Sequence, residues 1–415
     1  MNLDEARQLD HDDPLAPYRE AFHHPVDAGG DRLRYFCGHS LGLAPRRAAE
    51  VVGAALDRWA GMGVEGHFGE GPDWYRYDEP IAASMAGLVG ADPHDVAVMG
   101  TLTSNLHLLL ASFYRPEPSR PAVLIESNAF PSDRYAVQTQ IQWHGLDPEA
   151  HLIEWPVGPD GLLHLDDLDA VLAANGDRIT CSLLGGVNYA TGQRLDLAAV
   201  TSRLHAHGVM AGFDLAHAVG NVDVDLEASA ADFAAWCSYK YLNSGPGAVA
   251  SLYVARRHGD DPARVRLGGW WGNDPDTRFD MDVERRFVPV PGAAGWQQSN
   301  PPIFSLAPLS ASLDIFASAT APLWQEKSRR LVAMTMSLLD GVDGVVSLTP
   351  AAADQRGAQT SLQVAGAAEV AESLRSQGIV VDVRPPDIIR MAAVPLYNSY
   401  EDVWHAVAAL RTALT

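Results

Sequence analysis

The sequence has few cysteines, few basic residues and no long hydrophobic run. Its three cysteines, Cys37, Cys181 and Cys237, are widely spaced and none forms a C-x-x-C pair. This pattern excludes a disulfide framework and favours a reducing compartment, and we predict no metal site. No segment approaches the roughly 18 apolar residues that a membrane span needs. The acidic N-terminal segment also lacks the apolar stretch of a secretory signal, so we expect a soluble, cytoplasmic protein.

Basic residues are outnumbered, with 30 Lys and Arg against 52 Asp and Glu, so the formal charge is −22. Nucleic acids and anionic membranes attract cationic surfaces, and we therefore expect neither as a partner. The charge balance says little about small substrates, because a positive site can lie inside an acidic shell. The 415 residues are 47% hydrophobic, which is enough for a large core and predicts more than one lobe.

Short apolar runs alternate with helical patterns along the middle of the chain. Runs at 95–100, 122–126, 178–187, 209–217 and 247–255 read as strands. This alternation predicts an α/β fold with a mostly parallel sheet that is covered on both faces. After residue 310 the pattern changes to helices followed by short strands, as expected of a smaller α+β domain. The predicted division is an N-terminal segment that packs with the small domain and the active site, a large domain and a small C-terminal domain (1–65, 66–310 and 311–415).

Polar residues follow several of the predicted strands. Thr103, the segment 130–133, Asp214, His217 and Lys240 all occupy such positions. The carboxyl ends of parallel strands lie along one edge of the sheet, where ligands of open α/β sheets bind. We therefore expect the functional site at this edge.

Asp214 and Lys240 each end an apolar run in which few other charges occur. A buried carboxylate or ammonium is unfavourable unless it has a partner or a task. Pyridoxal phosphate (PLP) would use both, because its aldehyde bonds to a lysine amine and its pyridinium nitrogen needs an anionic partner. Alternatively, Asp214 caps a helix and Lys240 extends to the surface, which is the more common use of either residue alone. The pair together favours the cofactor.

Two further segments allow two interpretations each. The turn at 100–104 places Leu102 and Thr103 where helix N–H groups bind an anion, or where a threonine simply caps the helix. In "NAFPSDRYA", Phe130 either stacks on an aromatic ring or packs in the core, and Asp133 is either a ligand or a cap.

Four aromatic or sulfur-containing positions also allow more than one interpretation. The loop with Trp270 either presents its indole to a ligand or fills an interface. His67 lies in a glycine-rich loop, as an ordinary surface residue or as a contact for an aromatic substrate. Cys181 and Cys237 lie in apolar runs and are expected to be packing residues rather than nucleophiles.

Eight collinear segments between residues 35 and 403 form a highly specific set. They are "YFCGHSLGL" (35–43), "TLTSNLHLL" (101–109), "AFPSDRYA" (129–136), "GVNYATGQ" (186–193), "DLAHAVGN" (214–221), "CSYKYLNSGPG" (237–247), "SNPPIFSL" (299–306) and "VPLYNSYEDV" (394–403).

As a set, these segments resemble kynureninase. The resemblance implies a fold-type-I PLP-dependent transferase-like fold and a homodimer with shared active sites. It also implies hydrolysis of L-kynurenine, or of a ring-substituted form such as 3-hydroxykynurenine, to anthranilate (or its substituted form) and L-alanine. The pathways implied are tryptophan catabolism, the kynurenine pathway and NAD biosynthesis.

Carried over position by position, the resemblance assigns roles to individual residues. The catalytic residues it implies are Lys240, which bonds the cofactor and takes the α-proton, Asp214 at the pyridine nitrogen, and Tyr239 as a proton donor and acceptor. For the substrate it implies Arg390 at the α-carboxylate, with His67 near the aromatic ring and His39 in the same site. The implied cofactor-binding set is Leu102, Thr103, Phe130, Asp133, Asp214, His217, Tyr239, Lys240 and, across the dimer, Trp270 and Asn300.

The sequence departs from the family pattern at three positions. His39 stands where the family usually has asparagine, Gly185 where some members have a serine that contacts the cofactor, and Ala190 where some have an aromatic residue. These changes leave the cofactor residues intact but leave the ring substituent of the substrate open, with 3-hydroxy, methylated and halogenated kynurenines as alternatives.

Other functions of the same fold remain as alternatives. A PLP-dependent aminotransferase, or a kynureninase-like enzyme of a specialised-metabolite pathway, shares the logic of Asp214 and Lys240. A cysteine desulfurase needs a mobile cysteine in a late loop, and no cysteine follows Cys237. A catalytically silent scaffold would be expected to lose the lysine or its carboxylate, and this chain keeps both.

Overall fold

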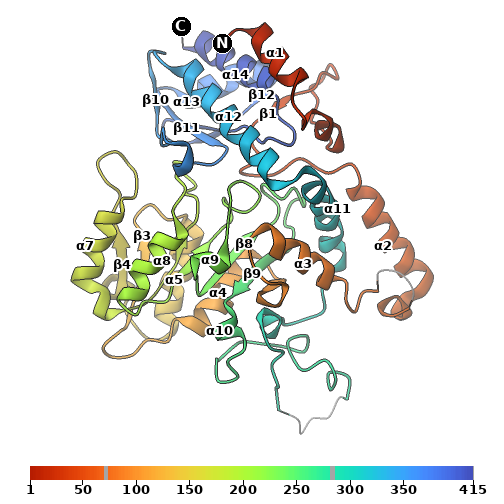
Figure 1. Cartoon of the computed structure of the whole chain (residues 1–415), viewed down its shortest axis with the longest axis vertical. Helices are drawn as coiled ribbons and strands as arrows, with labels where there is room; N and C mark the ends of the chain where they lie inside the picture. The colour runs from red at the N-terminus through yellow and green to blue at the C-terminus, as the bar shows by residue number, and fades with distance from the viewer. Residues whose placement is uncertain (70–72, 281–285, 415) are drawn as a thin grey trace.

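The computed structural model describes residues 1–69, 73–280 and 286–414. A central sheet in the large domain lies between layers of helices, and a smaller lobe carries both chain termini (Figure 1). The strands of the central sheet follow one another in space as β4 (Leu152–Trp155), β3 (Ala122–Glu126), β5 (Ile179–Ser182) with β6 (Leu184–Gly185), β7 (Gly212–Asp214), β8 (Phe233–Cys237), β9 (Ala250–Val254) and β2 (Val96–Val98).

Strands β5 and β6 are consecutive and join the two halves of this sheet. The N–H of Ser182 donates to the carbonyl of Met210 at 2.8 Å, and the N–H of Leu183 donates to that of Leu124 at 2.9 Å. The pairings of β9 with β8 and β2 are antiparallel, whereas the other pairings are parallel. The predicted mostly parallel α/β sheet is therefore confirmed.

Continuous apolar strands bury both faces of the sheet. In β3, Ala122 and Leu124 belong to one core, and Val123 and Ile125 belong to a second core on the other face. This alternation is the two-residue period of a strand that is covered on both sides. The helices of the large domain are α2 (Ala48–Met62), α3 (Asp78–Leu88), α4 (Leu102–Phe113), α5 (Pro131–Trp143), α6 (Pro148–His151), α7 (Leu165–Asn175), α8 (Leu197–Ala206), α9 (Leu226–Ser229), α10 (Arg256–Gly259) and α11 (Ile303–Ala319).

The small lobe has its own antiparallel sheet and its own core. Its strands follow the order β10 (Val345–Ser347), β11 (Gln359–Val364), β14 (Ile388–Ala392) and β13 (Asp382–Arg384), and β1 (Arg34–Tyr35) pairs with β12 (Ile379–Val380). Helices α12 (Ala321–Leu339), α13 (Ala367–Ser376) and α14 (Tyr400–Ala413) complete this core. The domain boundaries at residues 65 and 310 stay predictions.

The chain turns sharply between α11 and α12, at an angle of 87°. Within the described ranges, no single helix has both the length and the apolar character to cross a membrane, and these two pass that test only as a pair. Leu306 and Leu309 of α11 pack in the large-domain core, whereas Leu331 of α12 packs in the core of the small lobe.

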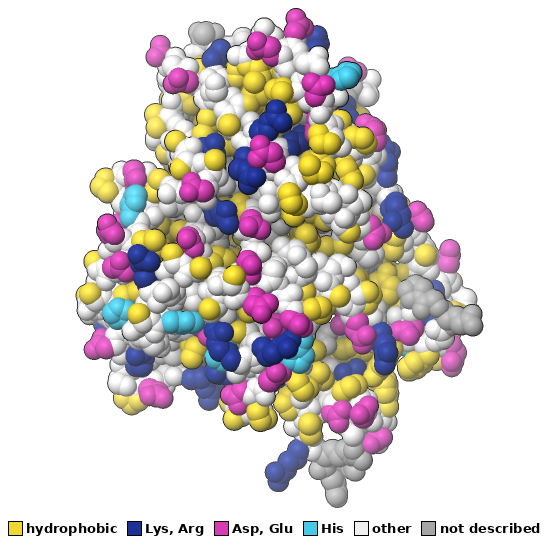
Figure 2. Space-filling model, viewed as in Figure 1, with side chains coloured by type: hydrophobic (Ala, Val, Ile, Leu, Met, Phe, Trp, Pro, Cys, Tyr) yellow, Lys and Arg dark blue, Asp and Glu magenta, His cyan; other side chains and the backbone are white. Residues whose placement is uncertain are grey.

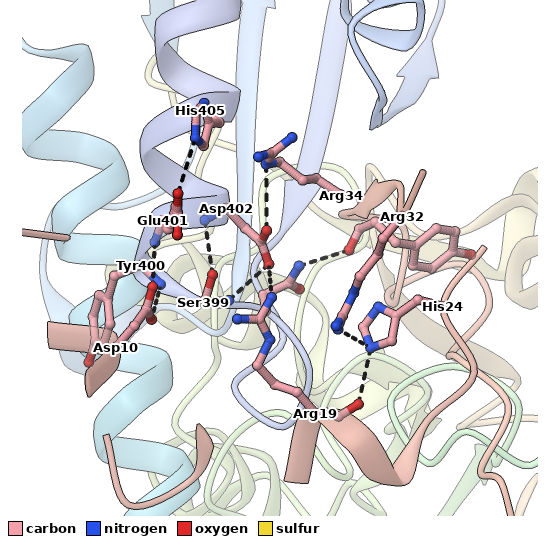
Figure 3. A network of polar contacts seen from close by, with 12 residues as sticks. Asp10, Arg19, His24, Arg32, Arg34, Ser399, Tyr400, Glu401, Asp402 and His405 are labelled. Carbon is pink, nitrogen blue, oxygen red and sulfur yellow. Dashed lines mark hydrogen bonds and ion pairs between the residues drawn. The ribbon is translucent and has the colours of Figure 1, made fainter. Parts of the chain in front are cut away.

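The N-terminal segment is attached to the small lobe by polar contacts (Figure 3). Helix α1 (Leu3–His11) packs against α14, and Asp10 accepts the N–H groups of Tyr400 and Glu401 at 2.8 and 2.9 Å. A carboxylate is stabilised at this position by the free N–H groups and the dipole of the helix. Arg19 contacts the Asp402 carboxylate at 3.1 Å, which fixes the next part of the segment.

Candidate active site

A cavity of about 290 Å³ lies at the carboxyl ends of the central strands. Glu126, Gly185 and Asp214 are the last residues of β3, β6 and β7, and all three line it. The volume is close to the lower end of the range for small-molecule sites. Eight of the predicted site residues line this cavity: Leu102, Thr103, Phe130, Asp133, Asp214, His217, Tyr239 and Lys240.

Asp214 ends a buried strand and is itself only 7% exposed. Its Oδ1 accepts the N–H of Ala216 at 2.7 Å. Burial raises the pKa of Asp214, while the nearby Lys240 ammonium and the Ala216 N–H act in the opposite direction. The side chain is therefore an acid that needs a cation beside it to ionise fully.

Two more buried carboxyls lie beside Asp214, so the prediction of few charges around it was wrong. Burial and the Asp214 charge raise the pKa of Asp133 well above its usual range. Burial raises the pKa of Glu126 to about 7. The Glu126 carboxyl accepts the N–H of Gly185, with Oε1 at 3.0 Å and Oε2 at 3.2 Å.

Lys240 is the cationic side chain in the lining of this cavity. Its Nζ lies 5.8 Å from the ring centroid of Phe130 and 5.9 Å from that of Tyr239. The sequence has two lysines, and the second, Lys327, forms a buried ion pair with Asp13 at 2.7 Å. Lys240 is thus the lysine amine that faces the cavity.

Three carboxyls share the cavity with one lysine amine, and burial disfavours the ionised form of each carboxyl. A second cation would lower the pKa of each carboxyl and so favour its ionised form. The protonated pyridine nitrogen of PLP carries such a charge, and its aldehyde requires a primary amine such as that of Lys240. The residues present therefore fit PLP.

The N-terminus of α4 offers a site for the phosphate of such a cofactor. Gly100 turns the chain with φ +57°, and a Cβ there would lie 2.4 Å from Asn105 Oδ1. The N-cap is Thr101, whose N–H donates to Ser104 Oγ at 2.9 Å. Thr103 instead lies inside the first turn, and its hydroxyl is 2.8 Å from Ser132 Oγ. The first-turn N–H groups have no acceptor within the helix, which favours an anion at this end.

Aromatic and imidazole groups form the sides of the cavity. Phe130 is the N-cap residue of α5 and packs edge-on against Tyr189, with ring centroids 5.2 Å apart. Burial lowers the pKa of His217 well below its usual range, so this imidazole is neutral. Burial raises the pKa of Tyr239, which keeps its phenol protonated at neutral pH.

Five predicted residues lie outside the lining of this cavity, and their roles stay predictions. The indole N–H of Trp270 donates to the carbonyl of Arg278 at 2.8 Å, and Asn300 is exposed. His67 packs edge-on against Trp74, with ring centroids 5.4 Å apart.

Arg390 and His39 lie in a separate cluster at the small lobe. Arg390 is 1% exposed, and its Nε–H donates to Asp382 Oδ2 at 2.8 Å. His39 is fully buried, and its Nε2 lies 3.3 Å from the same oxygen. Arg390 also donates through its terminal nitrogen Nη1 to the carbonyl of Tyr189 at 2.6 Å, which connects the cluster to the cavity wall.

The sequence interpretation missed Glu126, Ser132, Tyr189 and Asp382. Glu126 had a detectable signal, because it ends an all-apolar strand in the same way as Asp214. The packing role predicted for two cysteines is confirmed, since Cys181 and Cys237 are buried and burial raises the pKa of both thiols.

Known proteins resemble this chain over almost its full length. A family model described as the kynureninase C-terminal domain matches residues 324–410. Kynureninase from Xanthomonas campestris pv. campestris (strain B100) is 46% identical over 99% of this chain and 98% of its own length. Kynureninase from Myxococcus xanthus (strain DK1622) is 46% identical over 98% of this chain and 96% of its own length.

The chain belongs to the kynureninase family. The fold of this kynureninase-family chain is also that of solved PLP-enzyme structures. A C-DES mutant with glycine covalently linked to its PLP cofactor superposes with a TM-score of 0.79 at 19% identity, covering 95% of this chain and 98% of that chain. The cysteine desulfurase CsdA from Escherichia coli gives 0.79 at 19% identity, covering 96% and 98%. The predicted family and the predicted fold class are confirmed.

Proposed function

We propose that this chain is a PLP-dependent hydrolase that cleaves the Cβ–Cγ bond of L-kynurenine and releases anthranilate and L-alanine. The observation that carries the proposal is the cavity itself, in which Lys240 faces Asp214 and two further buried carboxyls. The family membership of the whole chain supports the same reaction. Tryptophan breakdown through the kynurenine pathway is the corresponding metabolic role.

Different residues of the cavity would hold different parts of the cofactor. Lys240 would bond the aldehyde, Asp214 would keep the pyridine nitrogen protonated, and Phe130 would lie against the ring. Leu102 and Thr103 hold the phosphate at the N-terminus of α4. When bound, PLP supplies an electron-accepting ring for the negative charge that develops at the substrate α-carbon.

The residues of the chain then bind the substrate and move its protons. Arg390 holds the α-carboxylate in a two-point contact for which lysine would be a poor replacement. Freed from the cofactor, the Lys240 amine removes the proton from the α-carbon. Tyr239, protonated at neutral pH, would donate a proton to the γ-oxygen and regain one from the added water, and would then pass a hydroxyl proton of the hydrated γ-carbon to the β-carbon as the Cβ–Cγ bond breaks. Water adds to the γ-carbonyl, so the aromatic product leaves as a carboxylic acid and the remaining three carbons leave as alanine.

Borohydride reduction of the cofactor-loaded protein tests the cofactor assignment. Because the sequence has two lysines, mass spectrometry of a digest distinguishes them directly. We expect the reduced cofactor on Lys240, its loss in Lys240→Ala, and its retention in the control Lys327→Arg, which has no primary amine at 327. Label on a peptide other than that of Lys240 would contradict the assignment.

Product analysis tests the reaction. Incubation with L-kynurenine should yield anthranilate and alanine in equal amounts, and Tyr239→Phe should lower kcat while the cofactor absorbance is retained. A keto acid formed without anthranilate would indicate an aminotransferase instead. A comparison of kcat/KM for 3-hydroxy, methylated and halogenated kynurenines identifies the ring substituent that the enzyme prefers.

The role proposed for Trp270 and Asn300 needs a homodimer with shared sites, since neither residue lines the cavity of its own chain. Exposed aromatic side chains, including Trp59 and Phe304 with ring centroids 5.9 Å apart, support an interface. Hydrophobic side chains also lie on the lower projection that residues 260–280 and 286–300 form (Figure 1 and Figure 2). Mixing inactive Lys240→Ala subunits with Asn300→Ala subunits should restore activity, because one of the two mixed sites then has both residues. Failure of every mixture, with dimers present, would place Asn300 in its own subunit's site or outside the site.

A further inference from the structure

The cluster around Arg390 lies between the N-terminal segment and the small-lobe sheet. We propose that Asp382, held by His39, is a positioning residue that fixes the Arg390 guanidinium in the orientation that receives the substrate α-carboxylate. This inference rests on the function proposed for Arg390. It also gives His39, which departs from the family pattern, a role away from the substrate itself.

Strand register places the two charged residues together. Asp382 on β13 is paired directly with Arg390 on β14 in the antiparallel ladder, and directly opposed side chains on one face are close enough to interact. Asp382 Oδ2 accepts from Arg390 Nε at 2.8 Å and also makes a short contact with Nη2. A contact of this type, along one edge of a planar guanidinium, fixes the plane of the group.

The N–H groups of Arg390 that Asp382 does not use indicate which ligand the fixed guanidinium can bind. A guanidinium has five N–H groups, one on Nε and two on each terminal nitrogen. Asp382 uses one on Nε and one on Nη2, and the Tyr189 carbonyl uses one on Nη1 at 2.6 Å. The second N–H of Nη2 has only a 3.5 Å contact with Ser40 Oγ, and within the described residues no acceptor is recorded for the second on Nη1. One donor on each terminal nitrogen is thus available for a second carboxylate.

His39 restrains Asp382 without adding charge. Its ring is fully buried, with Nε2 at 3.3 Å from Asp382 Oδ2. Burial lowers the pKa of His39 to about 4, so at neutral pH its Nε2–H is a neutral donor. Arg384 already lies beside this carboxylate, with Nη2 3.2 Å from Asp382 Oδ2, and a protonated His39 ring would add a further positive charge that competes for the substrate carboxylate. The neutral His39 ring therefore orients Asp382 and adds no charge beside Arg390.

The test compares ligands with and without a carboxylate on the cofactor-loaded protein. L-alanine and ethylamine both reach the cofactor through an amine, and binding of each is followed by the change in cofactor absorbance. The variants are Asp382→Asn, His39→Leu and His39→Asn, with Asp387→Asn as a control on the same hairpin. The Asp387 carboxylate accepts from Gln363 at 2.8 Å and makes no recorded contact with Arg390. Thermal unfolding of each variant is measured alongside.

We expect Asp382→Asn and His39→Leu to raise the Kd of L-alanine, and the KM of L-kynurenine, by about tenfold or more, because a charge-assisted hydrogen bond is lost. The Kd of ethylamine and the kcat should change much less. His39→Asn keeps an N–H donor and should lose about threefold at most. If Asp382→Asn does not fold, the contrast between His39→Leu and His39→Asn decides the question.

Equal weakening of L-alanine and ethylamine, or unchanged binding of both, would overturn the inference and leave Asp382 a structural residue. The alanine comparison does not depend on turnover of kynurenine. A wild-type protein that fails to cleave L-kynurenine, yet loses L-alanine affinity in Asp382→Asn, would therefore refute the proposed reaction and retain this positioning role.

Discussion

Replacement of Glu126 by glutamine tests the electrostatics of the cavity through the pH dependence of stability. Glu126 is 4% exposed at the end of β3, and its carboxyl accepts the N–H of Gly185. Burial raises its pKa to about 7. Glutamine keeps the shape and a side-chain oxygen for Gly185 but cannot ionise.

The sign and size of the effect follow from the two pKa values. In the unfolded chain a glutamate has a pKa of about 4.3. Between that value and about 7 the folded protein holds a proton that the unfolded chain has lost, so the wild type loses stability as the pH rises through this window. At about 1.4 kcal/mol per pH unit the whole loss sums to roughly 4 kcal/mol, of which roughly 3 kcal/mol falls between pH 5 and pH 8, and it is complete above about pH 8. The free energy of unfolding of the glutamine variant does not fall in this way, because glutamine does not ionise.

Urea unfolding of the cofactor-free protein, followed by tryptophan fluorescence, measures the difference at pH 5 and at pH 8. We expect Glu126→Gln to gain roughly 3 kcal/mol relative to wild type between these two pH values. Glu149→Gln on α6 removes an exposed carboxyl and should leave the difference from wild type unchanged. A constant difference between wild type and Glu126→Gln from pH 5 to pH 8 would refute the reasoning.

Two buried charge clusters away from the cavity give further predictions. Asp232 accepts from His258 at 2.7 Å and from Arg257 at 2.6 Å, so Asp232→Asn should lower the free energy of unfolding by about 3–5 kcal/mol in urea at pH 7. These donors hold the pKa of Asp232 well below its usual range, so its stabilisation is complete above about pH 4 and is lost at lower pH, which acid titration of wild type and variant should show. Lys327→Met leaves Asp13 buried without its partner and should cost about 3–5 kcal/mol, whereas Lys327→Met with Asp13→Leu should recover most of that loss.

The sheet edge with Asp214 and Lys240 could be predicted from the sequence because strand period and strand ends are local properties. Each residue follows an apolar run, and parallel strands carry their ends to one edge. Glu126 carried the same local signal, but a single acid at a strand end does not indicate that it is buried. The pKa shifts of the three carboxyls arise only when β3, β7 and α5 meet.

The contacts of Arg390 could not be predicted from the sequence. Its pairing with Asp382 depends on the register of β13 and β14, and a shift of one residue would move the two side chains to opposite faces. His39 reaches Asp382 from a segment 343 positions away, so no local pattern connects them. The roles proposed for Trp270 and Asn300 across a dimer are a different case, because the contacts within one chain do not test them.

The burial of the cavity carboxyls links the stability of the fold to the binding of a cationic cofactor. Burial raises the pKa of Asp214, Asp133 and Glu126, and the neighbouring Asp214 charge adds to the shift of the other two, so a folded chain without a second cation retains protons on this cluster. A cationic ring nitrogen beside Asp214 reverses that preference, since its attraction grows as the dielectric constant of the surroundings falls. The same burial that makes the ionised carboxyls unfavourable at high pH would thus strengthen their attraction for a pyridinium, and in the role proposed for it Lys240 would bond that ring. Glu126 affects the ionisation of this cluster through its charge. Its replacement by glutamine should therefore change how the stability depends on pH, and should leave Lys240 free to bond the cofactor.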